Sequence, residues 1–412
     1  MNTLNLAPSH GASFFPAQRV RTTQPSATKA MTALARDMFR QGMDVITLSQ
    51  GEPDFATPQH IRDAARFAID DGQSGYTEVP GTLALRQAIV RKFRRDNQLE
   101  FQPEQIQVGC GAKQVIYNAL QATLDGGDEV VIPAPMWVSY PEMVRLTGAT
   151  PVIVRCPAEH GFKLTPDALE AAITARTKWL MLNSPSNPTG AVYGAEELKA
   201  LARVLDAHPH VWIMCDDIYE KLRYDASPFA TMASVAPQLA DRTLTVNGMS
   251  KSFAMTGWRV GYGAGPVALI NAMNLIQSQS TSHTSSISQA AAIAALDGPM
   301  EFLDDFLQAF RRRRDFVVDR LASIDGLSCS LPDGAFYVFV NCEALLGRRA
   351  PSGVLIQTDA DLATYLLQAA HVALVPGSAF SLAGYLRLSY ATSETQLKLA
   401  LDRIARACAQ LR

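Results

Sequence analysis

The chain has 412 residues, of which 48% are hydrophobic and 18% are charged, and its formal net charge is −2. This composition excludes a largely disordered protein, and the near-neutral charge argues against binding to nucleic acid or to an anionic membrane surface. No apolar run approaches the roughly 18 residues that a membrane span needs. Because average chains carry roughly 25% charged residues, the low charged fraction indicates surface hidden by a partner subunit or by folding around a buried site.

Residues 1–19 are predicted to form an N-terminal arm. They lack the basic segment and apolar core of a secretory signal, and although Arg19 and Arg21 are faintly typical of a transit peptide, we favour a loose arm. The six cysteines show no CxxC spacing and no nearby pair of histidines. Their scatter argues against a zinc site or a disulfide framework and favours a cytoplasmic protein without a metal.

The middle of the chain alternates short β-rich runs with helical stretches, which is the pattern of a parallel sheet covered by helices. A helix is predicted over 113–124, where apolar residues recur on one face, and the Asp-Gly-Gly-Asp run at 125–128 ends it. The predicted strands of this region are 105–108, 129–132, 151–154, 179–182, 211–215 and 243–246.

A long charged helix is predicted over 300–324, and it contains four consecutive arginines at 311–314. These arginines point around the helix and are flanked by aspartates, so we expect a solvated or ion-paired helix rather than a nucleic-acid site. The predicted strands that follow are 335–340 and 386–390. We therefore predict a large α/β domain over residues 60–300 and a smaller α+β domain formed by residues 20–59 and 301–412.

Polar residues follow three of the predicted strands, and ligands bind at the carboxyl ends of strands in open parallel sheets. The segments after these strands carry an amide, a carboxylate, a phenol, a lysine and an arginine, which are Asn187, Asp216, Tyr219, Lys251 and Arg259. The set suits a cofactor that has an aldehyde for the lysine, a basic ring nitrogen for the carboxylate, a phenolic oxygen for the amide and phenol, and a phosphate for the arginine. Pyridoxal phosphate has all four groups.

The sequence resembles the pyridoxal-phosphate-dependent aminotransferases of fold type I, most closely the bacterial aspartate aminotransferase subgroup, over residues 17–410. The resemblance rests on separated motifs in the family's order, which are SQGEPDF (49–55), GYTEVPG (75–81), GAKQ (111–114), NSPSNPTG (183–190), DDIYE (216–220), VNGMSKSFAMTGWRVGY (246–262) and LRLSYATS (386–393). It implies an α/β fold whose large domain has a mostly parallel, seven-stranded sheet covered by helices. It also implies a homodimer with shared active sites.

Three residues match the family's catalytic set. Lys251 matches the lysine that forms a Schiff base with the cofactor and then moves a proton; a solvated surface lysine is the weaker interpretation, because its neighbours are uncharged and mostly small. Asp216 matches the carboxylate that keeps the ring nitrogen protonated. The family's Asp-x-x-Tyr spacing selects Asp216 with Tyr219, and Asp217 is then a structural or solvent-facing acid. Tyr219 and Asn187 match the pair that binds the phenolic oxygen, although Asn187 also suits turn chemistry.

The resemblance places the cofactor's phosphate near a helix start. Arg259 matches the phosphate-binding arginine, whose planar fork suits a phosphate. Gly111, Ala112 and Lys113 begin a predicted helix, where free N–H groups favour an anion. Tyr76 matches a tyrosine that reaches the phosphate of the neighbouring subunit's cofactor.

Further matches border the ring and the substrate. Trp137 matches the aromatic residue stacked on the pyridine ring, although a lone tryptophan is more often a core residue. Arg387 matches the arginine that pairs with the substrate's α-carboxylate, and a buried structural salt bridge is the weaker interpretation of this residue in an apolar strand. Gly51 matches the glycine whose backbone approaches the same carboxylate, and Asn187 and Trp137 also border the substrate.

An acidic substrate needs a second cation for its distal carboxylate. The stretch 277–286, where one branch of the family has an arginine, contains none here. The bacterial branch uses the lysine of the Gly-x-Lys motif, which is Lys113, and whether Lys113 turns into the site or faces water stays open. His283 has three interpretations: it narrows the pocket, it binds an acidic group when protonated, or it is a satisfied polar residue near the interface.

We therefore expect a ping-pong transaminase that moves an amino group from an L-amino acid, with aspartate or glutamate favoured, to a 2-oxo acid through a lysine Schiff base. The alternatives are an aminotransferase for aromatic or other neutral amino acids, or another pyridoxal phosphate reaction such as elimination or oxidative deamination. A non-catalytic sensor domain of a gene regulator is disfavoured, because too few residues precede the match at residue 17 for a helix-turn-helix domain.

Overall fold

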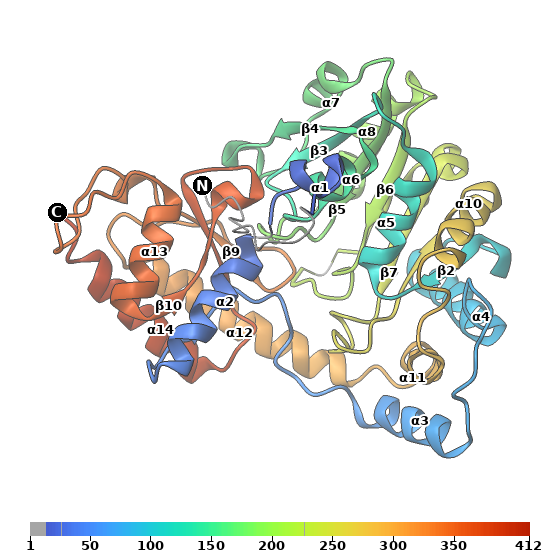
Figure 1. Cartoon of the computed structure of the whole chain (residues 1–412), viewed down its shortest axis with the longest axis horizontal. Coiled ribbons are helices and arrows are strands. Elements are labelled where there is room, and N and C mark those ends of the chain that lie inside the picture. The colour runs from blue at the N-terminus through green and yellow to red at the C-terminus, as the bar shows by residue number, and fades with distance from the viewer. Residues whose placement is uncertain (1–13, 26, 226) are drawn as a thin grey trace.

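The computed structural model describes residues 14–25, 27–225 and 227–412, so most of the predicted N-terminal arm lies outside the described residues. A seven-stranded sheet with the order β2-β8-β7-β6-β5-β3-β4 forms the centre of the larger part of the molecule (Figure 1). Its strands are β2 (Ile106–Gly109), β3 (Glu129–Ala134), β4 (Thr150–Arg155), β5 (Thr177–Asn183), β6 (Trp212–Asp216), β7 (Thr243–Gly248) and β8 (Gly261–Ala264).

The sheet is mostly parallel, as the sequence predicts. Strand β8 pairs antiparallel with both β2 and β7, and the other neighbours are parallel. The expected α/β fold with a seven-stranded, mostly parallel sheet is thereby confirmed. Each of the six strands predicted in this region is present with shifted ends, whereas β8 was not predicted.

Helices cover both faces of this sheet because successive strand residues point to opposite sides. Val130 and Ile132 pack in one core cluster, with α5, α6 and α10, while Val131 between them packs in another, with α7 and α8. The helices of this part are α3 (Gln59–Asp70), α4 (Leu83–Lys92), α5 (Ala112–Thr123), α6 (Tyr140–Thr147), α7 (Pro166–Ala172), α8 (Ala195–Asp206), α9 (Met232–Val235), α10 (Val267–Ser278) and α11 (Ser286–Asp297).

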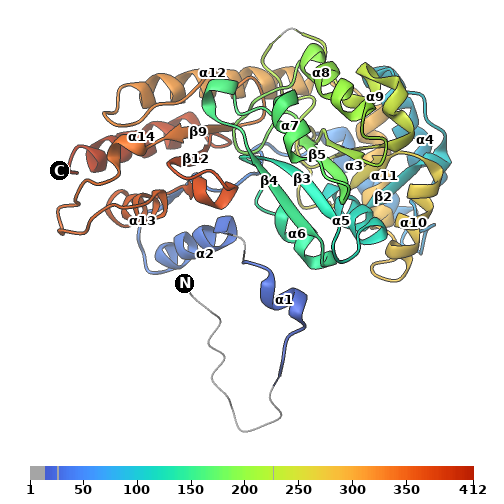
Figure 2. The same ribbon diagram turned by 90° about the horizontal axis from the view of Figure 1, so that it is seen from above.

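A smaller antiparallel sheet, in the order β11-β12-β9, forms the centre of the C-terminal part. The strands of this sheet are β9 (Tyr337–Asn341), β11 (Val375–Pro376) and β12 (Tyr385–Ser389). The helices of the C-terminal part are α12 (Phe302–Ala322), α13 (Asp359–Ala370) and α14 (Glu394–Cys408). Helix α12 runs along one side of the molecule, from the C-terminal part to the helices over the large sheet (Figure 2).

The N-terminal segment packs with this C-terminal part. Strand β1 (Ile46–Thr47) pairs in parallel with β10 (Val372–Ala373), and α2 (Ala27–Arg40) lies beside them, blue against orange and red in Figure 1. The short α1 (Gln18–Thr22) instead packs on α6. The β1–β10 pairing and the packing of α2 are contacts that the predicted grouping of residues 20–59 with 301–412 requires, whereas α1 contacts the larger part instead. The domain boundaries themselves stay a prediction.

The four arginines of α12 contact groups of this chain, and the exposed Arg312 lies 3.4 Å from the carboxylate of Glu394. Arg313 is buried and forms two bonds with the Asp54 carboxylate, at 2.7 and 2.9 Å. Arg311 donates to the carbonyl of Tyr224, and Arg314 to that of Pro332. The run therefore fastens α12 to its surroundings.

In the described part of the chain, no helix is both long and apolar enough to cross a membrane.

Candidate active site

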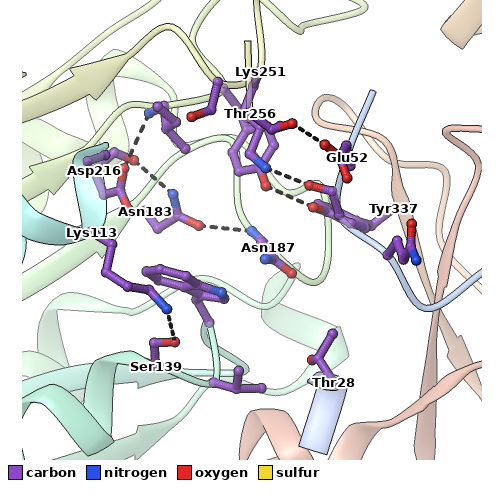
Figure 3. Close-up of a pocket in the computed structure, with 18 of the residues that line it drawn as sticks. Thr28, Glu52, Lys113, Ser139, Asn183, Asn187, Asp216, Lys251, Thr256 and Tyr337 are labelled. Atoms are coloured by element: carbon purple, nitrogen blue, oxygen red, sulfur yellow. Dashed lines mark hydrogen bonds between the residues drawn. The ribbon is translucent and has the colours of Figure 1, made fainter. Parts of the chain in front are cut away.

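A cavity of about 670 Å³ lies at the carboxyl ends of β5, β6 and β7, between the two sheets (Figure 3). Ten of the twelve predicted site residues line it, and these are Gly51, Ala112, Lys113, Trp137, Asn187, Asp216, Tyr219, Lys251, Arg259 and Arg387. Gly111 lies one residue away at the start of α5, whereas Tyr76 lies elsewhere and is 96% exposed.

Lys251 reaches the cavity from the loop after β7. Its Nζ donates a hydrogen bond of 2.6 Å to the carbonyl oxygen of Gly51. Burial lowers the pKa of Lys251 to about 8; the guanidinium groups of Arg387 and Arg259 act in the same direction, and the carboxylate of Glu52 opposes them. A large fraction of neutral amine at mildly alkaline pH is what a nucleophile or a proton-transferring base needs.

Asp216 ends β6 and is 5% exposed. Its Oδ2 accepts a bond of 2.5 Å from the hydroxyl of Tyr140, and Asn183 Nδ2 donates to its backbone carbonyl. Burial raises the pKa of Asp216 to about 6, while the bonds from Tyr140 and from the backbone N–H of Ile218 and the charge of Lys251 oppose that rise. Asp216 is therefore an ionised carboxylate at neutral pH, and it faces the cavity.

The neighbouring Asp217 does not line the cavity. It is 3% exposed, so a solvent-facing role is wrong and the structural alternative holds. Burial raises the pKa of Asp217 well above its usual value, and its Oδ2 has no hydrogen-bond partner among the residues that the structure describes. Of the two neighbouring aspartates, the one that the Asp-x-x-Tyr spacing selects, Asp216, is therefore the one that lines the cavity together with Tyr219.

Arg387 lies on β12 and is 2% exposed. Its guanidinium donates to Asn187 Oδ1 at 3.0 Å and to the carbonyl of Ser49, and it sits 4.7 Å from the ring centre of Tyr337. Within the described ranges no carboxylate pairs with it, and its Nε has no partner. This argues against the structural salt bridge, because a buried unpaired charge is costly and suits an anionic ligand.

Tyr219 adds a second buried polar contact beside Arg387. Its hydroxyl lies 2.8 Å from the hydroxyl of Tyr337. Burial, together with Tyr337, raises the pKa of Tyr219 well above its usual value, so the phenol stays protonated and can donate a hydrogen bond.

An anion site forms where α5 begins. Gly111 precedes the helix with a φ of +83°, which glycine adopts without strain. Arg259 lies against it and donates to the carbonyls of Cys110 and Thr256, at 3.1 and 2.9 Å. A Cβ added at Gly261 on β8 would overlap the backbone N of Ala112. A guanidinium and the free N–H groups of a helix start therefore converge on one corner of the cavity.

Lys113 and Trp137 form another wall. Lys113 Nζ lies 4.5 Å from the ring centre of Trp137 and donates to Ser139 Oγ at 3.0 Å. The side chain of Lys113 is exposed, yet it borders the cavity (Figure 3). Lys113 therefore lies in the first turn of α5 and is exposed, and it also borders the site where a distal carboxylate would lie.

His283 does not line the cavity of its own chain. Its Nδ1 lies 2.7 Å from the carbonyl of Thr284, and its Nε2 accepts the N–H of Thr77 at 3.2 Å. The ring of Tyr76 packs edge-on against it at 5.7 Å. Within one chain, both ring nitrogens of His283 have hydrogen-bond partners, which matches the interpretation of a satisfied polar residue. The same contacts hold the loop that carries Tyr76.

Several cavity residues were not predicted from the sequence. Tyr140 and Asn183 each form a hydrogen bond with Asp216, and Tyr337 lies against Tyr219. Thr28 and Arg36, from α2, line the cavity at its mouth. The nearness of Tyr140 to Trp137, three residues earlier in the loop that leads into α6, is the one local signal available. The others meet the site only through folding.

A sequence profile of the family described as "Aminotransferase class I and II" matches residues 43–404. The chain belongs to this aminotransferase family. Among curated relatives, the aspartate aminotransferase of Rhizobium meliloti (strain 1021) is 52% identical over 400 residues, covering 97% of this chain and 98% of the relative. The aspartate/prephenate aminotransferase of Cereibacter sphaeroides (strain ATCC 17029) is 53% identical over 397 residues, covering 96% and 99%.

Solved structures of aminotransferases agree with this membership. The aspartate aminotransferase from Rhizobium meliloti has a TM-score of 0.95 at 52% identity and covers 97% of this chain and 100% of its own. The aspartate aminotransferase from Thermus thermophilus with maleate has a TM-score of 0.89 at 44% identity, with 96% and 100% covered. Membership of this family of aminotransferases implies a pyridoxal phosphate cofactor.

Proposed function

We propose that this aminotransferase moves the amino group of aspartate, or of glutamate, to a 2-oxo acid by a ping-pong reaction that depends on pyridoxal 5′-phosphate. One observation carries the proposal. The amine of Lys251, with its pKa lowered to about 8, faces a cavity that also holds the buried carboxylate of Asp216 and the buried guanidinium of Arg387, which has no carboxylate partner among the described residues.

The residues of the cavity fit pyridoxal phosphate. The corner between Gly111, Ala112 and Arg259 has the close backbone approach and the positive charge that a phosphate needs. Asp216 can accept the N–H of a protonated pyridine ring, and the indole of Trp137 borders the same space. When bound, the cofactor supplies an aldehyde and an electron-withdrawing ring that stabilises negative charge at the substrate's α-carbon.

The protein's own groups then have separate tasks. Arg387 binds the α-carboxylate and so orients the substrate, with the Asn187 amide beside it. Lys251 Nζ, in its neutral form, would take the proton from the substrate's α-carbon and deliver it to the carbon that carries the cofactor's aldehyde. The hydroxyl of Tyr219 would donate a hydrogen bond to the cofactor's phenolic oxygen, since the phenol of Tyr219 stays protonated.

An acidic donor is favoured by Lys113. Its ammonium group stands over Trp137 at the cavity wall, where it can meet a distal carboxylate. The relatives named for aspartate or for aspartate and prephenate, and the maleate of the Thermus structure, support dicarboxylates as ligands. Neutral or aromatic donors, elimination and oxidative deamination become outcomes of the test below.

We also propose a cytoplasmic homodimer with shared active sites. Apolar side chains exposed on the single chain support a partner, among them Phe67 and Ile69 on α3 and Leu275 on α10, at 65%, 58% and 64% exposure. Tyr76 is exposed near α11 and suits contact with a second subunit. The six cysteines are all free, which suits a reducing compartment.

A half-reaction screen tests the function. The cofactor-loaded protein is mixed with each of the twenty amino acids, and the shift of its visible absorption band is followed. We expect a fast shift with aspartate and glutamate and one 2-oxo acid formed for each site. The absence of a visible band, equal rates with aromatic donors, or continued 2-oxo acid release without an acceptor would each contradict the proposal.

A further inference from the structure

Tyr140 touches two predicted cofactor-binding residues at once. It is the first residue of α6, borders the cavity and is 2% exposed. Its hydroxyl lies 2.5 Å from Asp216 Oδ2, and its ring packs edge-on against Trp137 with centres 5.4 Å apart and planes at 88°. A single side chain thus links the carboxylate and the indole.

The direction of the hydroxyl bond follows from the surroundings. Burial raises the pKa of Tyr140 well above its usual value, and the carboxylate of Asp216 raises it further. The phenol therefore keeps its proton and donates it toward Asp216. The other ionisable groups that act on this pair are Asp217, Tyr219 and Lys251.

The bond leaves the other oxygen of Asp216 available. Oδ1 accepts a longer bond, 3.4 Å, from the backbone N–H of Ile218. A carboxylate oxygen can accept two hydrogen bonds, so Oδ1 retains capacity for a donor in the cavity. Because Oδ2 is occupied by Tyr140, the carboxylate cannot rotate freely to present either oxygen.

We propose that Tyr140 is a positioning residue for the cofactor, which holds Asp216 ionised with Oδ1 toward the cavity and steadies the indole of Trp137. The inference rests on the proposed function, because it takes pyridoxal phosphate as the ligand. Removal of the hydroxyl would leave Oδ2 buried without its donor, and the ionised form of Asp216 would lose its main support.

Tyr140→Phe tests this by cofactor binding rather than by activity. Cofactor-stripped protein is titrated with pyridoxal phosphate from pH 6 to pH 8, and tryptophan fluorescence and the visible band are followed. We expect binding weaker by on the order of tenfold, the usual effect of a lost hydrogen bond to a charged group. The loss should grow as the pH falls, because the variant raises the pKa of Asp216.

Tyr193→Phe is the matched control. Tyr193 is also a buried tyrosine, and its hydroxyl accepts the backbone N–H of Leu164 at 2.7 Å away from Asp216. This variant should bind pyridoxal phosphate as the wild type does at each pH. Equal binding by Tyr140→Phe and the wild type would overturn the inference, whereas a wild type that binds no pyridoxal phosphate would instead overturn the proposed function.

A double-mutant cycle separates positioning from general packing. In an Asp216→Ala background, adding Tyr140→Phe should change the affinity little, because the acceptor of the tyrosine hydroxyl is gone. An undiminished effect there would contradict the inference. If Tyr140→Phe did not fold, 3-fluorotyrosine at position 140 keeps the ring and gives a stronger donor, so the pH midpoint of binding should move down; an unmoved midpoint would count against the inference.

Discussion

Lys251 is a buried lysine whose surroundings disfavour the charged form of its amine. Its pKa is lowered from 10.5 to about 8, so between these pH values the unfolded chain binds a proton that the folded chain does not. Folded stability therefore rises with pH across this window, and the full cost of the buried charge is present below pH 8. Residues placed for function commonly reduce stability in this way.

We expect cofactor-free Lys251→Met to unfold at a higher temperature than the cofactor-free wild type at pH 7. The difference should shrink as the pH rises from 8 to 10.5, since methionine carries no charge. Thermal unfolding of both proteins at a series of pH values measures it. A difference that stays constant with pH would show that the charge of the amine is not its cause.

Lys113 is the residue on which donor choice depends. Lys113→Ala should lower kcat/KM for aspartate by about tenfold or more, the usual effect of a lost hydrogen bond between charged groups. The value for alanine should stay unchanged, because alanine has no distal carboxylate. Steady-state rates with both donors measure this, with Lys199→Ala on the exposed face of α8 as the control. An equal loss for both donors would contradict the role.

Residues within motifs could be predicted from the sequence, whereas residues that act through other parts of the chain could not. Asp216 and Lys251 follow β-rich runs and stand in recognisable local patterns. Tyr337 meets Tyr219 across 118 positions, and nothing in its own neighbourhood indicates that contact. Arg387 was predicted by its motif, but its buried setting beside Asn187 depends on the packing of β12.

At the level of elements, β8 shows what a propensity-based prediction misses. Its sequence, Gly-Tyr-Gly-Ala, has little β-propensity. It is a strand because β2 and β7 pair with it on either side and leave all four residues buried. The two-residue strands β1, β10 and β11 were missed for a related reason, since so few residues carry no periodicity.

The glycines of β8 also position the start of α5. Gly261→Ala should weaken binding of pyridoxal phosphate, because the added Cβ would overlap the backbone of Ala112 and displace the N–H groups of the anion site. Overpacking of this kind costs about 1–3 kcal/mol. Titration of the stripped protein with pyridoxal phosphate, and competition by inorganic phosphate, measure the effect.

Gly126→Ala is the matched control for that variant. No atom lies within 4 Å of a Cβ built at Gly126, and the residue is in the turn after α5. It should bind both ligands as the wild type does. If Gly261→Ala also kept the wild-type affinity for phosphate and cofactor, the anion site would not depend on this close approach.

On the scale of the whole molecule, segments that are far apart in the sequence meet. Ile46 pairs with Val372, and Arg403 of α14 binds Asp44, so the N-terminal segment is tied to the C-terminal part. The sequence predicts this grouping through a change of composition near residue 300 and through the resemblance. It does not predict the register, because pairings between distant two-residue strands leave no local signal.

Self-association is the prediction that belongs to this scale. Sedimentation velocity at micromolar concentration should give a particle of two chains, because α3 and α10 expose apolar side chains that a partner would bury. Tyr76→Phe should then weaken cofactor binding modestly while the dimer persists. A single chain with full transaminase activity would contradict shared active sites.

The rate of the half-reaction with aspartate, in the wild type and in Lys251→Ala, tests the central claim most directly. Lys199→Ala serves as the matched control for the loss of a lysine. The account predicts that the wild type and the control convert aspartate to its 2-oxo acid with a rapid shift of the visible band. Lys251→Ala should be slower by about a thousandfold or more, because it lacks the group that moves the proton. A Lys251→Ala protein that reacts at the wild-type rate would contradict the account.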